Sequence, residues 1–284
     1  MYLSPIADDV VATGWRAHLA LAFARRDIGT VLVRRSHRGP LTVQKPLYQE
    51  GPEVCQVIVL HPPGGVAGGD ELSLDVEVGA GARALITTPG AAKWYRSSGA
   101  QATQSLRMSV SAGGVLEWLP QETIFFEGAR AALRTRVELD EAALFIGWEV
   151  SCFGRTAAGE GFGLGQVLQS SEILRHGVPL FGEYARIEGG SPLLEARSGL
   201  AGHPVSGLLV AAGRDPGGEL LSTLRAVDPG PGALAGVTTL PKLAIARYLG
   251  PSAQNARAYF VHLWALLRPA LTERAAVAPR IWSC

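Results

Sequence analysis

Apolar and polar side chains alternate along most of the first two thirds of the chain, which is the pattern of strands buried on one face. The clearest example is residues 72–78, where leucine and valine alternate with serine, aspartate and glutamate. Residues 54–60 form a nearly continuous apolar run of strand length. Residues 15–23 and 30–35 predict an opening pair of strands, and residues 44–48 lead through a Gly-Pro turn toward the apolar run. We therefore expect a mainly β protein.

A rough repeat of about 30 residues runs through this part of the chain. Strand-like residues flank a tight turn at 76–82, again at 109–115 and a third time at 137–143. Regular spacing of strands and turns is typical of coils stacked on one another. The pattern predicts stacked, solenoid-like β layers that form an extended sandwich, and we assign residues 1–200 to this β-rich scaffold body.

The last third of the chain mixes strands with helices. Strands are predicted at residues 205–212, 234–239 and 242–248. Helices are predicted at residues 216–227 and 251–267, and we expect Pro269 to end the second helix. Residues 201–284 should therefore form a small C-terminal α+β subdomain with two helices, joined to the body as one structural unit.

The most unusual stretch, HPPGGVAGGD at residues 61–70, lies between two of the predicted strands. Its two prolines and its four glycines (Gly64, Gly65, Gly68 and Gly69) exclude regular structure, because proline lacks an amide donor and glycine reaches positive φ without strain. A specified turn is one interpretation, and an anion-binding nest or a channel wall is another. The stretch is not a P-loop, since no Lys-Ser or Lys-Thr follows the glycines.

Charge and composition exclude several classes of partner. The formal net charge is +1, and 47% of the residues are hydrophobic. Because there is no basic patch or polybasic run, we expect neither nucleic acid nor a membrane surface as a partner. There is no apolar run of about 18 residues, and Asp8 and Asp9 stand where a signal peptide would be basic, so we expect a cytoplasmic protein.

The cysteines and the search for known motifs give mostly negative results. Cys55, Cys152 and Cys284 are odd in number and far apart, which argues against a disulfide framework and a tetrahedral zinc site. Cys55 is flanked by apolar residues and should be a small buried side chain. GFGLG at residues 161–165 lacks the helix and the acidic partner of a dinucleotide site, so we interpret it as a glycine-rich crossing.

Two further predicted loops, at residues 88–100 and 119–129, carry clusters of aromatic residues. Aromatic side chains beside arginine are typical of interface anchors, but rings that close the ends of a β core explain the same pattern equally well. The candidates for partner binding are Trp94, Tyr95, Arg96, Phe125 and Phe126.

The residues alone indicate a protein that binds rather than catalyses. The alternative is an enzyme whose glycine-rich loops hold an anionic ligand, with Asp70 or Glu122 as acid or base.

Four motifs resemble those of the urease accessory protein family UreD, also called UreH. They are HPPGGVAGGD at 61–70, TPGAAKWYRS at 88–97, LEWLPQE at 116–122 followed by Phe125-Phe126, and RYLG at 247–250 followed by Trp264 and Arg268-Pro269. The resemblance extends from about Trp15 to Trp282 and is weaker between about Arg186 and Leu240.

The resemblance implies a non-enzymatic urease maturation factor. Such a scaffold binds urease apoprotein, joins UreF and the GTPase UreG, and helps to place nickel in the urease active site, and the resemblance implies an internal passage for the ion. It implies no tightly bound cofactor, with nickel only as an ion in transit. Since the working form is a complex, the isolated chain should be poorly soluble or self-associating, and UreF should rescue it.

The same resemblance points to candidate metal residues. Asp70 ends the first motif, and Glu183 matches a second acid proposed to face the passage. His61, in the first motif, is a further candidate. Sparse carboxylates suit transit, whereas several His or Cys ligands would trap nickel, which lies high in the divalent affinity order.

Overall fold

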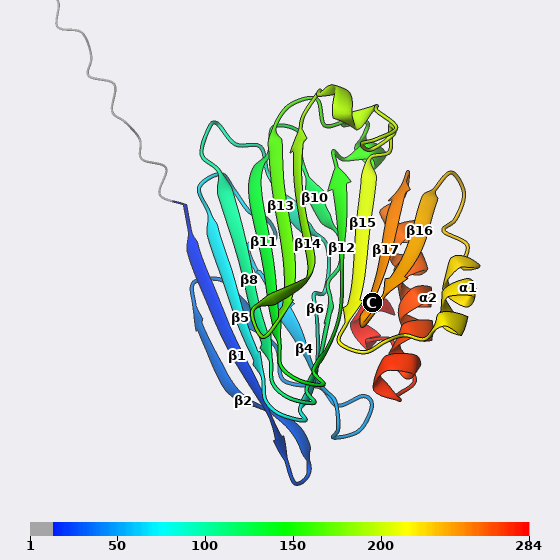
Figure 1. The fold of residues 1–284 in the computed structure, drawn as a ribbon. Helices are drawn as coiled ribbons and strands as arrows, with labels where there is room; N and C mark the ends of the chain where they lie inside the picture. Colours follow the sequence, from blue (N-terminus) through cyan, green and yellow to red (C-terminus); the bar gives the residue numbers. More distant parts are fainter. Residues whose placement is uncertain (1–13, 284) are drawn as a thin grey trace, which may run out of the picture.

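The computed structural model describes residues 14–283, so Asp8, Asp9 and Cys284 lie outside the described residues. Two β-sheets face each other as a sandwich, with the helices packed on one side (Figure 1). The seven-stranded sheet contains β1 (Arg16–Arg26), β2 (Gly29–Arg38), β5 (Glu71–Val78), β8 (Ala102–Val110), β11 (Arg130–Leu139), β13 (Gln166–Arg175) and β14 (Val178–Glu188), in the order β14-β13-β11-β8-β5-β1-β2.

The ten-stranded sheet contains strands that alternate along the chain with those of the first sheet, and it also contains the C-terminal strands. It contains β3 (Thr42–Val43), β4 (Cys55–Leu60), β6 (Arg83–Thr87), β7 (Ala92–Trp94), β9 (Val115–Leu119), β10 (Thr123–Phe125), β12 (Leu144–Phe153), β15 (Val205–Ala212), β16 (Leu234–Leu240) and β17 (Leu243–Gly250). The main order is β16-β17-β15-β12-β9-β6-β4-β3, and β10 pairs with both β12 and β7.

The middle of the sandwich is a β-solenoid. β5, β8 and β11 each pass through a tight turn into β6, β9 and β12 of the other sheet, and neighbouring coils pair in parallel. The turns stack through backbone hydrogen bonds, since the Gly81 amide donates to Ala112 O at 3.0 Å and the Gly113 amide donates to Glu141 O at 3.1 Å. These stacked coils confirm the predicted repeat and the mainly β fold.

The C-terminal strands continue the ten-stranded sheet in antiparallel fashion, because β15 pairs with β12 and β17 pairs with β15. Two helices, α1 (Gly218–Arg225) and α2 (Ala253–Thr272), pack on this part of the sheet. Phe260, Leu263 and Trp264 of α2 join Trp148 of β12 in a second hydrophobic core. The division at residue 200 stays a prediction, and the strands on either side of it share one sheet.

Neither α2, with its 20 residues, nor any other helix in the described part of the chain is long and apolar enough to cross a membrane. Three short 3-10 helices complete the structure, at Thr156–Ala158, Pro192–Leu194 and Arg280–Ser283.

Two predictions about local structure need correction. Residues 88–100 and 119–129 are not loops throughout, because they contain β7 and β10, which are too short to show an alternating pattern. Pro269 does not end α2, which continues to Thr272. The last turn is closed by other bonds, since Thr272 Oγ1 donates to Arg268 O at 2.8 Å and the Glu273 amide donates to Pro269 O at 3.0 Å.

The glycine-rich crossing predicted at residues 161–165 is present. The Gly189 amide donates to Gly165 O at 2.9 Å, and the Gly190 amide donates to Phe162 O at 3.0 Å. A Cβ at Gly189 would collide with the backbone of Leu164, so the two segments can approach this closely only with glycine at the contact.

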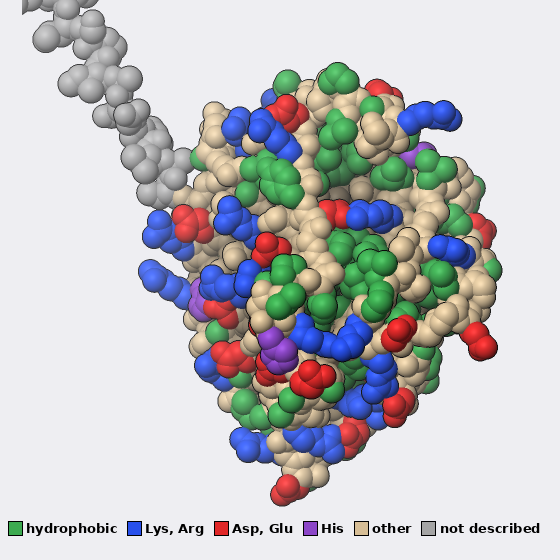
Figure 2. Space-filling view, viewed as in Figure 1, with side chains coloured by type: hydrophobic (Ala, Val, Ile, Leu, Met, Phe, Trp, Pro, Cys, Tyr) green, Lys and Arg blue, Asp and Glu red, His purple; other side chains and the backbone are tan. Residues whose placement is uncertain are grey.

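The edge of the ten-stranded sheet formed by β17 and β16 extends beyond β14, the edge strand of the other sheet. Leu234 and Leu240 of β16 lie opposite Leu249 and Leu243 of β17, which contact the core between the sheets. Leu234 is nevertheless 57% exposed and Leu240 is 51% exposed. Figure 2 shows hydrophobic side chains gathered on this side, over β14, β15 and β17. We call the surface around Leu234 and Leu240 the open apolar face.

Candidate functional site

A cavity of about 260 Å³ lies between the two sheets and reaches the loop at residues 61–70. Its lining is mixed, with apolar side chains from both sheets and a group of polar side chains that point inward. These polar side chains include Gln104, Thr135, Glu149, Ser151 and Gln169.

Among the described residues that line this cavity, Glu149 of β12 is the only one with a carboxylate. It lies between the two sheets, is half-buried and lines the cavity. Thr135 Oγ1 donates to Glu149 Oε1 at 2.7 Å, and no described Lys or Arg forms an ion pair with it. Burial raises the pKa of Glu149, and the negative charge of Glu183 raises it further.

A second cavity of about 30 Å³ adjoins the first. Trp118, Thr135 and Glu149 line both cavities, and the smaller one continues to Phe181 and Leu208. Glu149 therefore lies where the two cavities meet.

Glu183 lies on β14 and forms an ion pair with Arg247 of β17 across the edge of the sandwich. It is not among the residues that line either cavity. Glu183 lies opposite Ser171, which lines the smaller cavity, and its partner Arg247 lies opposite Gly236, between Leu234 and Leu240 of the open apolar face.

The loop at residues 61–70 forms part of the wall of the larger cavity. His61 lines the cavity, and burial lowers its pKa while the charge of Asp70 opposes that shift. Gly65 also lines it, and a Cβ there would collide with the ring of Tyr95. The loop glycines thus allow close approach, as at Gly65, or a positive φ, as at Gly64 (76°).

Asp70 fastens this loop to the start of β1. Its Oδ1 accepts a hydrogen bond from the Trp15 amide at 2.8 Å, and its Oδ2 accepts one from the Ala67 amide at 2.8 Å. Asp70 is not among the residues that line the cavity. Both carboxylate oxygens are therefore engaged in holding the backbone.

The structure does not bring His61, Asp70 and Glu183 together. In residues 14–283 there is no group of three or more His, Cys, Asp or Glu side chains that could hold a metal ion. The two described cysteines are buried, and burial raises the pKa of Cys55 and raises that of Cys152 to about 12. Neither thiol is disposed to act as a nucleophile or a ligand at neutral pH, and Cys55 is the buried side chain that the sequence predicts.

The aromatic candidates divide into two groups. Trp94 and Phe125 are 1% and 0% exposed and pack in the core. Tyr95 and Phe126 lie nearer the surface, where their rings meet edge to face with 5.1 Å between the ring centres. Arg96, next to Tyr95 in the sequence, is exposed. Only Tyr95, Arg96 and Phe126 are placed to contact a partner.

The residues of the enzyme alternative do not form an acid–base pair over the cavity. Glu122 Oε2 lies 3.8 Å from Arg257 Nη1, and Asp70 holds two amides. Neither side chain lines the cavity.

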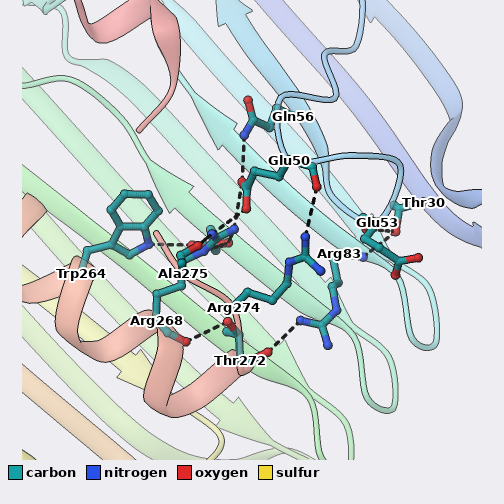
Figure 3. A network of polar contacts seen from close by, with 11 residues as sticks. Thr30, Glu50, Glu53, Gln56, Arg83, Trp264, Arg268, Thr272, Arg274 and Ala275 are labelled. Atoms are coloured by element: carbon teal, nitrogen blue, oxygen red, sulfur yellow. Dashed lines mark hydrogen bonds and ion pairs between the residues drawn. The ribbon is translucent and has the colours of Figure 1, made fainter. Parts of the chain in front are cut away.

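A buried polar network joins α2 to the body of the sandwich (Figure 3). Arg268 Nε donates to both carboxylate oxygens of Glu117 at 3.0 Å, and its Nη1 donates to Glu50 Oε2 at 2.6 Å. Trp264 Nε1 donates to Glu117 Oε2 at 2.6 Å, and Gln56 Nε2 donates to Glu50 Oε1 at 3.0 Å. This network fixes the position of the C-terminal helix.

Reasoning from the sequence missed both Glu149 and this network. Glu149 is the one charged residue in the mostly apolar strand LFIGWEVSCF, which is a usable signal. Glu117 and Arg268 belong to motifs that the sequence singled out, but nothing local shows that residues 151 positions apart are bonded.

Comparison with known proteins agrees with the resemblance. The sequence model of the UreD urease accessory protein family matches residues 16–283. The chain is 48% identical over 282 residues to the urease accessory protein UreD of Dechloromonas aromatica, covering 98% of both chains. It is 49% identical over 271 residues to UreD of Azoarcus sp. strain BH72, covering 95% of this chain and 94% of the relative. It is also 49% identical over 271 residues to UreD of Pseudomonas aeruginosa, covering 95% of each.

Proposed function

Because the chain belongs to the UreD urease accessory protein family, we propose that it binds urease apoprotein, UreF and the GTPase UreG in the cytoplasm and assists nickel insertion into urease. Members of this family are urease maturation factors and are not catalysts themselves. The alternative of an enzyme that uses Asp70 or Glu122 as acid or base is therefore wrong.

Nickel is the cargo in this proposal, and its route runs between the two sheets. The ion enters near Glu183, passes by the smaller cavity to Glu149 and crosses the larger cavity to His61 at the loop. The observation that carries the proposal is that Glu149 lines both cavities. Asp70 lies off this route and holds the loop.

The donors along the route suit transit. A cation that leaves water needs oxygen or nitrogen atoms to replace its hydration shell. Glu149 supplies one carboxylate, and Thr135, Ser151 and Gln169 supply neutral oxygens near it. So few charged donors hold the ion weakly, whereas a cluster of His or Cys would retain it.

The route predicts a nickel-dependent defect for Glu149→Leu. The variant loses the charged donor where the two cavities meet, so activation of urease apoprotein at limiting nickel should fall at least about tenfold, the effect of about 1.4 kcal/mol on a barrier. Excess nickel should restore part of the rate. The measurement is urease activity against time after wild type or variant is mixed with urease apoprotein, UreF, UreG, GTP and nickel.

Glu77→Gln is the matched control, because Glu77 lies on β5 with its carboxylate on the outer face, paired with Arg34 at 2.6 Å. It should activate urease normally. Thermal melting of Glu149→Leu should stay at or above the wild-type midpoint, since a buried carboxyl is replaced by an apolar side chain. Normal activation by Glu149→Leu at limiting nickel would show that the route does not pass this residue.

We assign the open apolar face to UreF, since an interface that is permanently covered in a complex leaves apolar surface when the partner is absent. The isolated chain should therefore elute from a sizing column as a concentration-dependent oligomer. Leu234→Lys with Leu240→Lys should shift it to monomer and weaken UreF binding. Val178→Lys, at an equally exposed position on β14, is the control and should change neither property. A wild-type chain that is monomeric without UreF would contradict the assignment.

A further inference from the structure

The opening of the larger cavity is built by β7 and the loop at residues 61–70. The Val66 amide donates to Lys93 O at 2.7 Å, and the Tyr95 amide donates to Val66 O at 2.9 Å, so the two segments pair side by side. Trp94 points into the core, and Lys93 and Tyr95, its neighbours in the alternating strand, point to the opposite side. Lys93 lines the cavity and is exposed, which places it at the opening.

The opening carries two cations that have no ion-pair partner among the described residues. Among residues 14–283, no carboxylate forms an ion pair with Lys93 or with the exposed Arg96. Glu160, whose pKa is lowered by the hydrogen bonds from Arg155 and the Glu127 amide and by the charge of Arg96, is already paired with Arg155. Some surface cations have a cross-strand carboxylate, as Arg107 has in Asp75 at 2.7 Å, whereas Lys93 and Arg96 can pair with carboxylates of a partner.

An aromatic platform adjoins these cations. The ring of Tyr95 covers Gly65, Phe126 meets Tyr95 edge to face, and the Arg155 guanidinium lies 4.4 Å from the centre of the Phe126 ring. Tyr95 is 39% exposed. Rigid aromatic side chains flanked by arginine are the composition of energetically important interface residues.

We propose that the surface formed by Lys93, Tyr95, Arg96 and Phe126 is where the protein that receives the ion docks, through a segment that presents carboxylates to Lys93 and Arg96. This rests on the proposed function, and it adds the surface and the charge of the partner. The receiving protein under that function is urease apoprotein.

Charge complementarity determines both the partner and the end of the route. A divalent cation at this opening is repelled by Lys93 and Arg96, whereas at the other end Glu183 is already neutralised by Arg247. Carboxylates of a docked partner cancel the repulsion and supply the next oxygen ligands. The uncovered chain thus opposes release of the ion, and the docked chain permits it.

The test is the affinity of the full chain for urease apoprotein, measured by biolayer interferometry with immobilised apoprotein. Lys93→Glu with Arg96→Glu should weaken binding at least about tenfold, because like charges placed together across an interface are strongly unfavourable. Lys93→Ala with Arg96→Ala should give a smaller loss. Raising salt from about 50 to about 300 mM should weaken wild-type binding and affect the alanine variant less.

Arg26→Glu with Arg35→Glu is the matched control. It makes the same change in net charge at two exposed arginines of β1 and β2 that form no ion pair with a described carboxylate. The control should bind like wild type, and all variants should melt like wild type. If the glutamate variant binds as tightly as wild type, or the control loses as much, the inference is wrong while the proposed function stands. If wild type itself does not bind urease apoprotein, both are wrong.

Discussion

Arg268→Met should lower the free energy of unfolding by about 3–5 kcal/mol, the usual cost of removing one partner from a buried ion pair. The side chains of Arg268, Glu50 and Glu117 are only 1%, 2% and 3% exposed. Methionine fills a similar volume but supplies none of the donors. Two carboxylates would then be left in the interior without a cation, which is the origin of the loss.

The effect should reach beyond the ion pairs because the same arginine positions the end of the chain. Arg268 also donates to Ala275 O, and Arg83 Nη1 donates to Thr272 O at 3.1 Å at the end of α2. Trp264 shares Glu117 with Arg268. We therefore expect loss of the near-ultraviolet circular dichroism of the tryptophans around α2 together with the loss of stability.

The loss should also depend on pH. Burial raises the pKa of Glu117 above its ordinary 4.5, and Arg268 opposes that shift. Without Arg268, the folded-state pKa rises further, so above pH 4.5 the unfolded chain holds fewer protons than the folded chain. Stability of the variant must then fall as pH rises from 4.5, and the difference from wild type should shrink toward acid pH.

Urea denaturation at several pH values measures these effects. Arg257→Met is the control on the same helix, since Arg257 is 29% exposed and pairs with Glu122 at 3.8 Å, and it should cost less than about 1 kcal/mol. Equal stability of Arg268→Met and wild type at pH 7 would mean that the network does not hold α2.

The parts of the fold that follow from local patterns were predictable. Alternation in residues 72–78 identified β5, and the turn spacing identified the solenoid coils. The continuation of α2 beyond Pro269 was not predictable, because it depends on hydrogen bonds that Thr272 and Glu273 make after the proline. Likewise β10 is defined by its partners β7 and β12 and not by its own three residues.

The candidate site was predictable to a smaller extent. The sequence located the loop at residues 61–70 and one wall of the cavity, since glycines and prolines mark an unusual backbone. It did not reveal that Asp70 faces backbone amides or that Glu149 faces the cavity. Both depend on which residues of distant strands lie opposite each other, which a single sequence does not show.

Asp70→Ala should cost about 1–3 kcal/mol, the penalty for leaving hydrogen-bonding groups without their partner. The two amides, of Trp15 and Ala67, each donate at 2.8 Å to a different oxygen of the carboxylate. Both bonds lie near the surface, so water can replace part of what is lost and the cost should fall toward the lower limit. The start of β1 should become more open to proteolysis near Trp15.

Asp70→Asn separates the structural role from a role in nickel transit. The carboxamide oxygen can accept from one of the two amides, but its NH₂ group faces the other, so Asn should lose less stability than Ala. If Asp70 only fastens the loop, urease activation should follow stability, with Asn close to wild type at limiting nickel. Glu71→Ala is the control, because Glu71 is exposed and pairs with Arg16 at 3.4 Å at the surface.

The opposite result has a distinct signature. If Asp70 were a ligand on the nickel route, Asn and Ala would both lose activation at limiting nickel, since both remove the negative charge, although Asn keeps most of the stability. Both carboxylate oxygens already accept amide hydrogens, and Asp70 does not line the cavity, so its position fits fastening of the loop and not contact with an ion between the sheets. We therefore expect activation by Asp70→Asn to match wild type within about twofold, below the effect of 1 kcal/mol on a rate.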